Sequence, residues 1–481
     1  YVSADLAAAL RRLGCEAEIL KEPDDFSQLA MAHTLSVVDR LRPDLIVLAN
    51  YPRSTMSGSF PANVPYITWL QDAMPHLFDA AVGRSQGGLD YLVGHLFIEL
   101  FQKHGYPMDR LLPVSLVADD AKFHPGPVEP SLAARFGCDV AMVSHQSETP
   151  AAMHERIVAE HDHAPDIQGA LERIYPRIGA AVDDAMEYPV ARRLREVCEE
   201  ELGSVFGAAI PAKAMDVVYR GYAMPLGDRM MRHQTLAWAA EICDRRGWRL
   251  HLYGRGWEKH PTLSRFARGE LAHGEELRAA YQCAAVHLHA SSTTLVHQRI
   301  VECALAGGLC LCRLHYDALS GPRSRAQRAL IDRPHDAVRE DGRPGWTIAD
   351  HAETMALASA MGAVGMPYTE DRIWLAPARI ENMRRFSALQ SDDHDATTLL
   401  GDLAETTFAD AAGLERMLLR AMERGSWRDA TAAMIAARAR DRFTHTALAA
   451  RMIDLVADDL STHDVDTGAT TAGDAPAGAA A

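Results

Sequence analysis

Polar residues able to hold a phosphate-bearing ligand gather in one stretch of the sequence. Serine and threonine side chains follow an apolar run and lead into a helical pattern. The free N–H groups and positive dipole end of a helix start attract phosphate. Because the formal net charge is -16, such a ligand also needs a local basic cluster. The candidates are Ser291, Ser292, Thr294, His297 and Arg299, with Arg229 and Arg232 earlier in the chain.

A glycine-rich run, YGRGW at 253–257, follows an expected strand. Glycine lets a backbone approach a ligand closely, and an aromatic ring offers a flat face to a base or sugar. The run is equally consistent with a tight strand-exit turn that carries a packed aromatic residue. The candidate binding residues at strand ends are Tyr253, Gly254, Gly256 and Trp257, with Arg220 and Gly221 at the end of another expected strand, 216–221.

One carboxylate stands one turn inside the helix expected at 296–306. Glu302 lies off the apolar face formed by Val296, Ile300 and Cys303, so we expect it to point towards the loop side. There its two oxygens can accept both hydroxyls of a ribose. As an isolated residue it is also consistent with an ordinary solvated helix position.

Two histidines, His287 and His289, stand at the spacing of two metal ligands on one strand face. No cysteine, aspartate or glutamate partner follows nearby, so we interpret them as packed strand residues and predict no metal. In the first part of the chain, Asp72 follows the run VPYITWL with His76 close behind. Asp72 is a candidate general base for an acceptor hydroxyl, or else the N-cap of the next segment.

The elements that position these residues alternate between short apolar runs and helical patterns. Runs such as DLIVLA at 44–49 are typical of parallel strands buried on both faces. Strands alternating with helices at this spacing predict an α/β fold with parallel sheets. The expected strands lie at 15–20, 44–49, 64–70, 138–143, 216–221, 248–253, 284–290 and 309–313.

Breaks in this pattern predict the domain organisation. Near residue 120 the pattern changes, because LVADDAKFHPGPVEP combines Asp, Pro and Gly without periodicity and is typical of a linker. We expect a first domain at 1–125, a second at 126–443 with a helical insertion at 150–212, and a final helix at 444–460. The tail, 461–481, lacks large apolar residues and is predicted to be disordered. Since Tyr1 already begins a helical pattern, we expect a strand to precede it.

Composition excludes several functional classes. The acidic balance argues against a nucleic-acid or anionic-membrane partner. No run of about 18 apolar residues predicts a spanning helix, and no signal peptide is recognisable. The eight cysteines show no framework spacing, so we interpret them as reduced residues of a cytoplasmic protein.

The stretch VHLHASSTTLVHQRIVECALAGGLCLCR, with LHLYGRGWEKHP before it, resembles the donor-binding half of the CgeB-like (spore maturation protein type) glycosyltransferases. CDVAMVSHQSE, GYPMDRLLPVSLVADDAKFHP and FTHTALAARMIDLV resemble other parts of that family. The resemblance implies a GT-B fold: two Rossmann-like domains facing a cleft, a nucleotide-sugar donor on the second domain, and no cofactor.

In the related E-x(7)-E group the second Glu binds the donor ribose and matches Glu302. The first Glu, which contacts the sugar there, is replaced by Thr294. The R-x(4)-K pair that neutralises the diphosphate is not in register, and Arg220, Arg229 and Arg232 are the available substitutes. The resemblance therefore implies transfer of a sugar to an unknown acceptor. A non-catalytic nucleotide-sugar-binding protein with an assembly role, or a sugar-nucleotide epimerase, are the alternatives.

Overall fold

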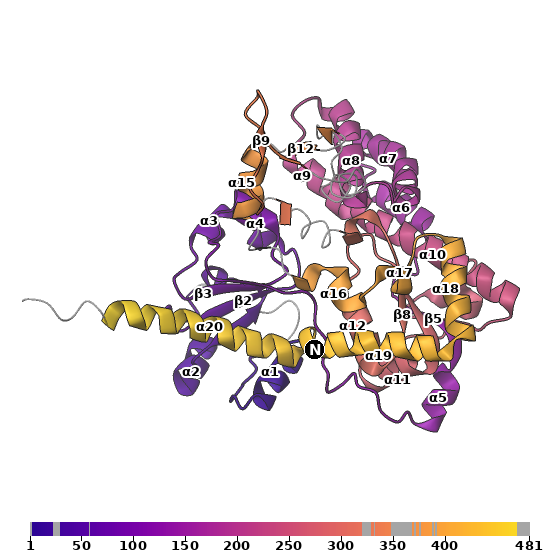
Figure 1. The fold of residues 1–481 in the computed structure, drawn as a ribbon, viewed down its shortest axis with the longest axis horizontal. Coiled ribbons are helices and arrows are strands. Elements are labelled where there is room, and N and C mark those ends of the chain that lie inside the picture. The colour runs from indigo at the N-terminus through magenta and orange to yellow at the C-terminus, as the bar shows by residue number, and fades with distance from the viewer. Residues whose placement is uncertain are drawn as a thin grey trace, which may run out of the picture. The chain divides into compact units, whose positions relative to one another are not determined.

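The computed structural model describes residues 2–22, 29–56, 58–319, 329–330, 332–347, 368–369, 372–374, 377–386, 389 and 392–468. These residues divide into two compact units (Figure 1). The first unit holds the chain up to Val117 and from Thr444 onward. The second holds Ala118 to Phe443, except for a short stretch around Leu389.

A four-stranded parallel sheet in the order β1-β2-β3-β4 forms the centre of the first unit. The strand β2, YITWL, is buried along its whole length, as parallel strands covered on both faces are. The elements of the first unit are α1 Val2–Arg12, α2 Met31–Leu41, β1 Ile46–Ala49, η1 Arg53–Met56, β2 Tyr66–Leu70, η2 Pro75–Leu77, α3 Ala80–Arg84, β3 Asp90–Gly94, α4 Ile98–Lys103, β4 Leu111–Pro113 and α20 His445–Gly468.

The last helix of the chain, α20, completes the core of this unit. Leu448, Met452 and Val456 recur every four residues and pack in one cluster with Leu6 and with inward residues of the sheet. The hydroxyl of Tyr91 on β3 donates to Asp459 at 2.7 Å, which fixes the outer part of the helix. Residues at both ends of the sequence therefore build one hydrophobic core.

A five-stranded parallel sheet, in the order β13-β8-β7-β5-β6, forms the centre of the second unit. Its elements up to the last long strand are α5 Pro130–Phe136, β5 Cys138–Val143, α6 Pro150–Glu160, α7 Pro165–Asp183, α8 Val190–Phe206, α9 Ala212–Met215, η3 Asp216–Ala223, α10 Met224–Arg246, β6 Leu250–Tyr253, η4 Trp257–Lys259, η5 Ser264–Phe266, α11 Glu275–Cys283, β7 Ala284–His289, α12 Gln298–Ala306 and β8 Cys310–Arg313.

A small antiparallel sheet, β11-β12-β10-β9, and a group of helices complete the second unit. The remaining elements are η6 Tyr316–Leu319, β9 Ala337–Val338, β10 Pro344–Thr347, β11 Tyr368–Thr369, β12 Arg372–Trp374, α15 Pro377–Arg385, η8 Asp392–His394, α16 Ala396–Leu400, α17 Leu403–Thr406, β13 Thr407–Phe408, α18 Ala411–Glu423 and α19 Gly425–Arg442. None of the helices in the described part of the chain combines the length and apolar character needed to cross a membrane.

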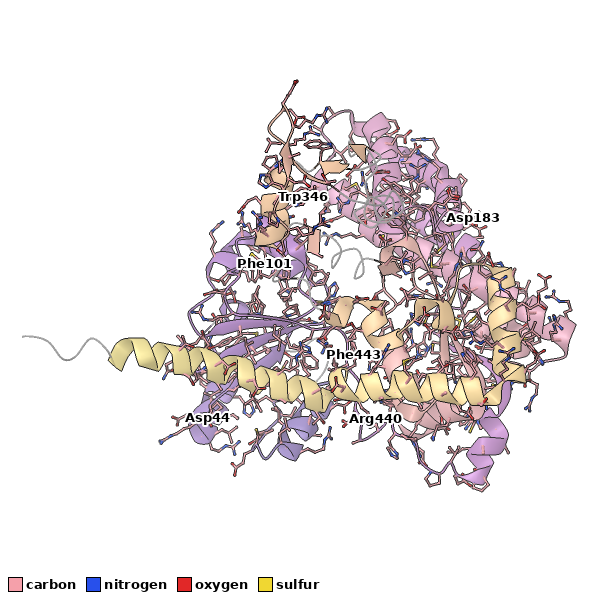
Figure 2. All side chains as sticks on the ribbon, viewed as in Figure 1. Asp44, Phe101, Asp183, Trp346, Arg440 and Phe443 are labelled. Atoms are coloured by element: carbon pink, nitrogen blue, oxygen red, sulfur yellow. The ribbon has the colours of Figure 1, made fainter. Side chains whose placement is uncertain are left out.

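The chain passes between the two units at neighbouring points. Phe443, labelled in Figure 2, is buried, and its carbonyl accepts a hydrogen bond from the N–H of Ala118 at 2.9 Å. The α/β fold class and the two Rossmann-like parallel sheets expected for the GT-B type are confirmed.

Three local expectations are wrong. Residues 15–20 form no strand, since no described strand lies beside them to complete a ladder. Residues 216–221 belong to the π-helix η3 and not to a strand. Helix α20 continues through Gly468, so 461–468 are helical where disorder is predicted. Extending an existing helix costs far less than nucleating one, which accounts for that extension. Residues 469–481 lie outside the described residues.

Candidate functional site

The strand order of the second unit creates a topological switch point between β5 and β7. From β5 the chain continues to β6 on one side, and then crosses to β7 on the other. In open parallel sheets, ligands bind outside the carboxyl ends of the strands at such a point. Ser144 directly follows β5, and Ala290 directly follows β7. These two positions therefore mark where a ligand site is expected.

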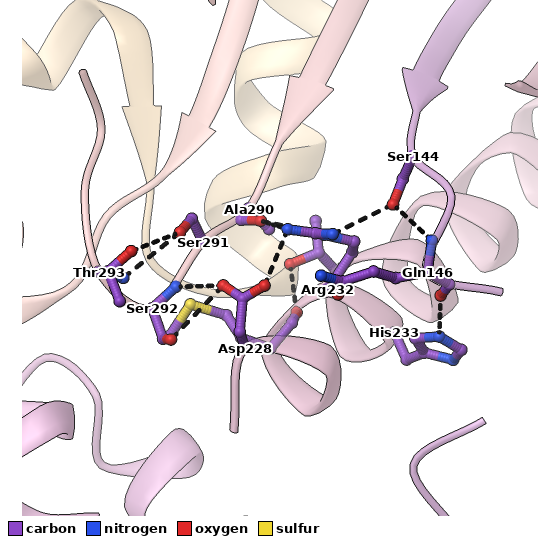
Figure 3. A network of polar contacts seen from close by, with 11 residues as sticks. Ser144, Gln146, Asp228, Arg232, His233, Ala290, Ser291, Ser292 and Thr293 are labelled. Atoms are coloured by element: carbon purple, nitrogen blue, oxygen red, sulfur yellow. Dashed lines mark hydrogen bonds and ion pairs between the residues drawn. The ribbon is translucent and has the colours of Figure 1, made fainter. Parts of the chain in front are cut away.

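A single arginine on helix α10 connects the two strand ends (Figure 3). Arg232 donates from Nη1 to the hydroxyl of Ser144 at 3.1 Å, and from Nε and Nη2 to the carbonyl of Ala290 at 3.3 and 3.1 Å. It also pairs with Asp228 at 3.0 Å. Burial lowers the pKa of Arg232, and Asp228 opposes that effect. The bidentate, buried geometry makes Arg232 a fixed cation at the switch point.

Asp228 holds the loop that follows β7. One of its oxygens accepts from the N–H of Ser292 at 2.9 Å, while the other receives Arg232. Ser291 and Thr293 are joined by their hydroxyls at 3.1 Å, and Ser292 is fully buried. Figure 3 shows these residues lying side by side above α10. The loop is thus fixed to α10 by a carboxylate that the sequence analysis did not select.

The loop ends at the start of helix α12, which His297 caps. The Nδ1 atom of His297 accepts from the N–H of Arg299 at 3.2 Å. Burial, together with Arg299 and Arg232, lowers the pKa of His297 to about 3. The hydroxyl of Thr294 accepts from the N–H of Val296 at 3.0 Å, which shapes the turn before the cap. At neutral pH this helix start is capped by an uncharged imidazole.

Arg299 stands in the first turn of α12. Within the described ranges, its guanidinium makes no hydrogen bond or ion pair, although the residue is half-buried. Its charge lowers the pKa values of Arg232, His289 and His297. Two guanidinium groups near a helix N-terminus, one without a counter-ion, create a strongly positive position suited to an anion.

Arg229 stands one helical turn from Arg232 but faces the loop after β5. It donates to the carbonyl of Glu148 at 2.8 Å, and its Nε is buried without a hydrogen-bond partner in the described structure. Its neighbour His233 donates to the carbonyl of Gln146 at 2.8 Å, and burial lowers the pKa of His233 to about 4. Both side chains fix the loop after β5 to α10.

Glu302 lies on α12, and only 3% of the residue is exposed. Its oxygens accept from the hydroxyl of Tyr281 at 3.2 Å and from the amide of Gln298 at 3.0 Å, and His273 lies 3.5 Å away. The solvated alternative is therefore wrong, because α11 packs against this face and places Tyr281 on the carboxylate. A buried carboxylate held by exchangeable neutral donors can receive hydroxyls in place of the Gln298 amide.

The run after β6 has the geometry of a packed strand-exit turn. Gly254 has φ +134°, and a Cβ there would lie 2.0 Å from the carbonyl of Ser144, so only glycine fits. Trp257 is buried and donates to that carbonyl at 2.6 Å. Tyr253 is also buried, with its ring 5.9 Å from that of Phe136. Neither aromatic face is open to a base or sugar, and Gly256, with φ +87°, lies against Ser147.

Two further predicted residues stand apart from this cluster. Arg220 and Gly221 lie within the π-helix η3 and not at a strand end, and Arg220 pairs with Asp216 at 3.3 Å on the surface. The run places Val217, Val218 and Tyr219 in succession, residue types favoured in strands, which explains the mistaken strand. His287 and His289 are both buried on β7, and no group of three potential ligands that could hold a metal occurs among the described residues.

Asp72, on the first unit, is an exposed residue that Asn50 orients. The side-chain amide of Asn50 donates to Asp72 at 3.2 Å, and its oxygen accepts from the N–H of Asp72 at 3.1 Å. Asn50 has φ +62°, a left-handed conformation that costs energy in a residue other than glycine. The carbonyl of Asn50 also accepts from His76 at 2.7 Å. Asp72 does not cap a helix, so the N-cap alternative is wrong.

Comparisons with known proteins give structural neighbours only. No protein-family model matches the chain, and no curated protein matches it in sequence. Among solved structures, a glycosyltransferase from Rickettsia africae ESF-5 is similar, with a TM-score of 0.41 and 7% identity over 95% of this chain and 94% of that chain. The N-terminal domain of trehalose-6-phosphate phosphatase from Candida albicans gives a TM-score of 0.35 and 8% identity over 88% of this chain and 72% of that chain.

Proposed function

We propose that the protein is a glycosyltransferase of the CgeB-like type, and that its second unit binds a nucleoside diphosphate sugar. The observation that carries the proposal is the open guanidinium of Arg299 beside Arg232 at the start of α12. The mutual repulsion of two cations is relieved when an anion lies between or across them. A diphosphate supplies that charge and matches the planar fork of a guanidinium.

The residues around Arg299 bind the other parts of the donor or hold the site in shape. Arg299 receives the diphosphate together with those N–H groups at the start of α12 that His297 does not cap, while Asp228 and Arg232 keep the loop from Ser291 in place. Glu302 receives the ribose hydroxyls, which replace the amide of Gln298. Arg229 supports the loop after β5 and contributes positive charge.

In the transfer step, the oxygen of an acceptor hydroxyl forms a bond to the anomeric carbon of the sugar. The bond from that carbon to the diphosphate oxygen breaks, and its electron pair leaves with the diphosphate. Asp72 on the first unit is our candidate for the base that takes the proton of the acceptor. Arg299 and the helix start stabilise the negative charge that develops on the leaving group. The acceptor itself is unidentified.

A second candidate function is nucleotide-sugar binding without transfer. The hydroxyl of Thr294, where relatives carry the sugar-contacting Glu, is occupied in a turn by the N–H of Val296. A site lacking that carboxylate favours binding over chemistry. Incubation with radiolabelled donors and hydrolysis controls distinguishes the two. Donor binding with no transfer or hydrolysis, over a wide acceptor panel, favours the second candidate.

Calorimetric titration with a panel of nucleoside diphosphates tests the anion site directly. For Arg299→Ala, we expect the dissociation constant of the best-binding nucleoside diphosphate to rise at least about tenfold, the effect of losing one charge-assisted contact. The matched control is Arg255→Ala, which also removes one cation at a strand exit of this sheet. Arg255 is exposed and paired with Glu270, so we expect a change of less than about twofold.

Equal losses in the two variants would mean that only net charge matters and would contradict a specific anion site at Arg299. Failure of the wild-type protein to bind any nucleoside diphosphate would contradict the proposed function itself.

A further inference from the structure

Two buried histidines near the proposed donor site have ring nitrogens without a hydrogen-bond partner in the described structure. His289 ends β7 and is 3% exposed, and His315 follows β8 and is completely buried. In the structure as described, Nε2 of His289 and both nitrogens of His315 lack a hydrogen-bond partner. A buried polar group without a partner is costly to stability, so two such groups at one sheet edge call for a functional explanation.

The surroundings place both imidazoles next to the donor site. The ring of His289 lies 4.8 Å from that of His297, the cap of α12. Besides burial, the groups that lower the pKa of His289 are His297, Arg232, Arg299 and His315, whereas Arg313 lowers the pKa of His315 and Asp228 raises it. Asp228 in turn holds the loop at Ser292. His289 thus packs against the cap of α12, and His315 follows β8, the strand that pairs with β7 at His289.

The charge state of the pair limits what it can bind. Burial is the main cause that lowers both pKa values, to about 4 for His315 and well below the ordinary value for His289. Both rings are consequently neutral at physiological pH. A neutral imidazole offers one N–H donor and one acceptor nitrogen. Two of them suit a group whose atoms both donate and accept, which describes sugar hydroxyls better than an anion.

We propose that His289 and His315 bind hydroxyl groups of the sugar carried by the donor. This inference rests on the proposed function and extends it to the sugar part of the ligand. It provides the contact that Thr294 cannot make, since that short side chain is engaged in the turn before α12. Both imidazoles are covered in the ligand-free chain, so sugar entry requires the side chains that cover them to move.

Calorimetric titration of His315→Phe and His289→Phe tests the proposal, because phenylalanine keeps the ring and removes the nitrogens. The probes are UDP with UDP-glucose, GDP with GDP-mannose, and further matched pairs of free and sugar-bearing nucleotide. For the pair that the wild type binds, we expect the dissociation constant of the sugar nucleotide to rise about tenfold in each variant. The dissociation constant of the free nucleotide should change less than about twofold, because this ligand does not reach the two rings.

The melting temperature of the ligand-free variants separates binding from support of the fold. His315→Phe should melt at or above the wild-type temperature, since it removes an unpaired buried polar group. His154→Phe is the matched control, because both nitrogens of that buried ring have partners, Tyr222 at 2.7 Å and Glu172 at 3.1 Å. This variant should have a lower melting temperature than the wild type. It should bind the free nucleotide and the sugar nucleotide each with the affinity of the wild type.

Unchanged affinity for the sugar nucleotide in both variants would overturn this inference and leave the proposed function standing. An equal loss of affinity for the free nucleotide and the sugar nucleotide, together with a lower melting temperature, would also overturn it, in favour of a structural role. A wild type that binds neither probe of any pair would overturn both proposals.

Discussion

Glu302 illustrates at the residue scale how a single side chain links burial to recognition. Its carboxylate is buried and receives Tyr281 and Gln298, so its position is fixed before a ligand arrives. We expect Glu302→Gln to weaken nucleoside diphosphate binding by about tenfold or more.

A thermodynamic cycle that combines the protein variant with a modified ligand tests this assignment. The wild type and Glu302→Gln are each titrated with the nucleoside diphosphate and with its 2′-deoxy form. The two losses should not add, since both remove one contact. Fully additive losses would show that Glu302 acts elsewhere. Circular dichroism of Glu302→Gln provides the folding control.

Residue types alone indicated part of the candidate site. The basic and hydroxyl residues near α12 were identifiable because they precede a helix start. Ser144 and Asp228 were missed, although the spacing of Asp228 and Arg232 by four residues is a readable ion-pair signal on a helix. Ser144 carried no such signal, because its role depends on β5 and β7 being neighbours in space. The burial of Glu302 likewise depends on α11, which no local pattern shows.

At the scale of elements, strongly apolar runs were the most predictable. The strands β1, β2, β5, β6, β7 and β8 all lie within expected ranges, because buried parallel strands have continuous apolar sequences. The π-helix η3 was missed since its valine and tyrosine residues are of types favoured in strands. A wide helical turn is set by packing against neighbouring helices and has no reliable sequence pattern.

Helix α20 gives a quantitative prediction at this scale. Met452 is 1% exposed in the core shared with α1 and the first sheet. We expect Met452→Ala to lower the free energy of unfolding of the first unit by about 2–5 kcal/mol, because it leaves a cavity. Scanning calorimetry should show the shift, and Asp454→Ala, an exposed change on the same helix, should change stability by less than about 0.5 kcal/mol. Equal effects would contradict this packing role.

For the whole molecule, the buried histidines of the second unit set the response to acid. Burial lowers the pKa to about 4 for His233, His287 and His315, and to about 3 for His297. In the unfolded chain these side chains bind protons near pH 6.5. Between pH 6.5 and about 4 the unfolded state therefore binds more protons than the folded state, and stability falls as pH falls.

Each such histidine contributes up to about 1.4 kcal/mol per pH unit within that window. We expect the melting temperature of the second unit to be nearly constant from pH 8 to 7 and to fall steeply from pH 6.5 to 5. Calorimetry at half-unit steps measures this directly. A melting temperature that stays constant down to pH 5 would contradict the neutral state of these rings.

The participation of α20 in the core of the first unit also has a consequence for protein synthesis. The second unit is nearly continuous in sequence, from Ala118 to Phe443, whereas the first needs Leu448, Met452 and Val456 from the last helix. On the ribosome, domains fold as their residues emerge. The unit that begins first must therefore wait, with its sheet uncovered on one face, until the unit inserted within it has been translated.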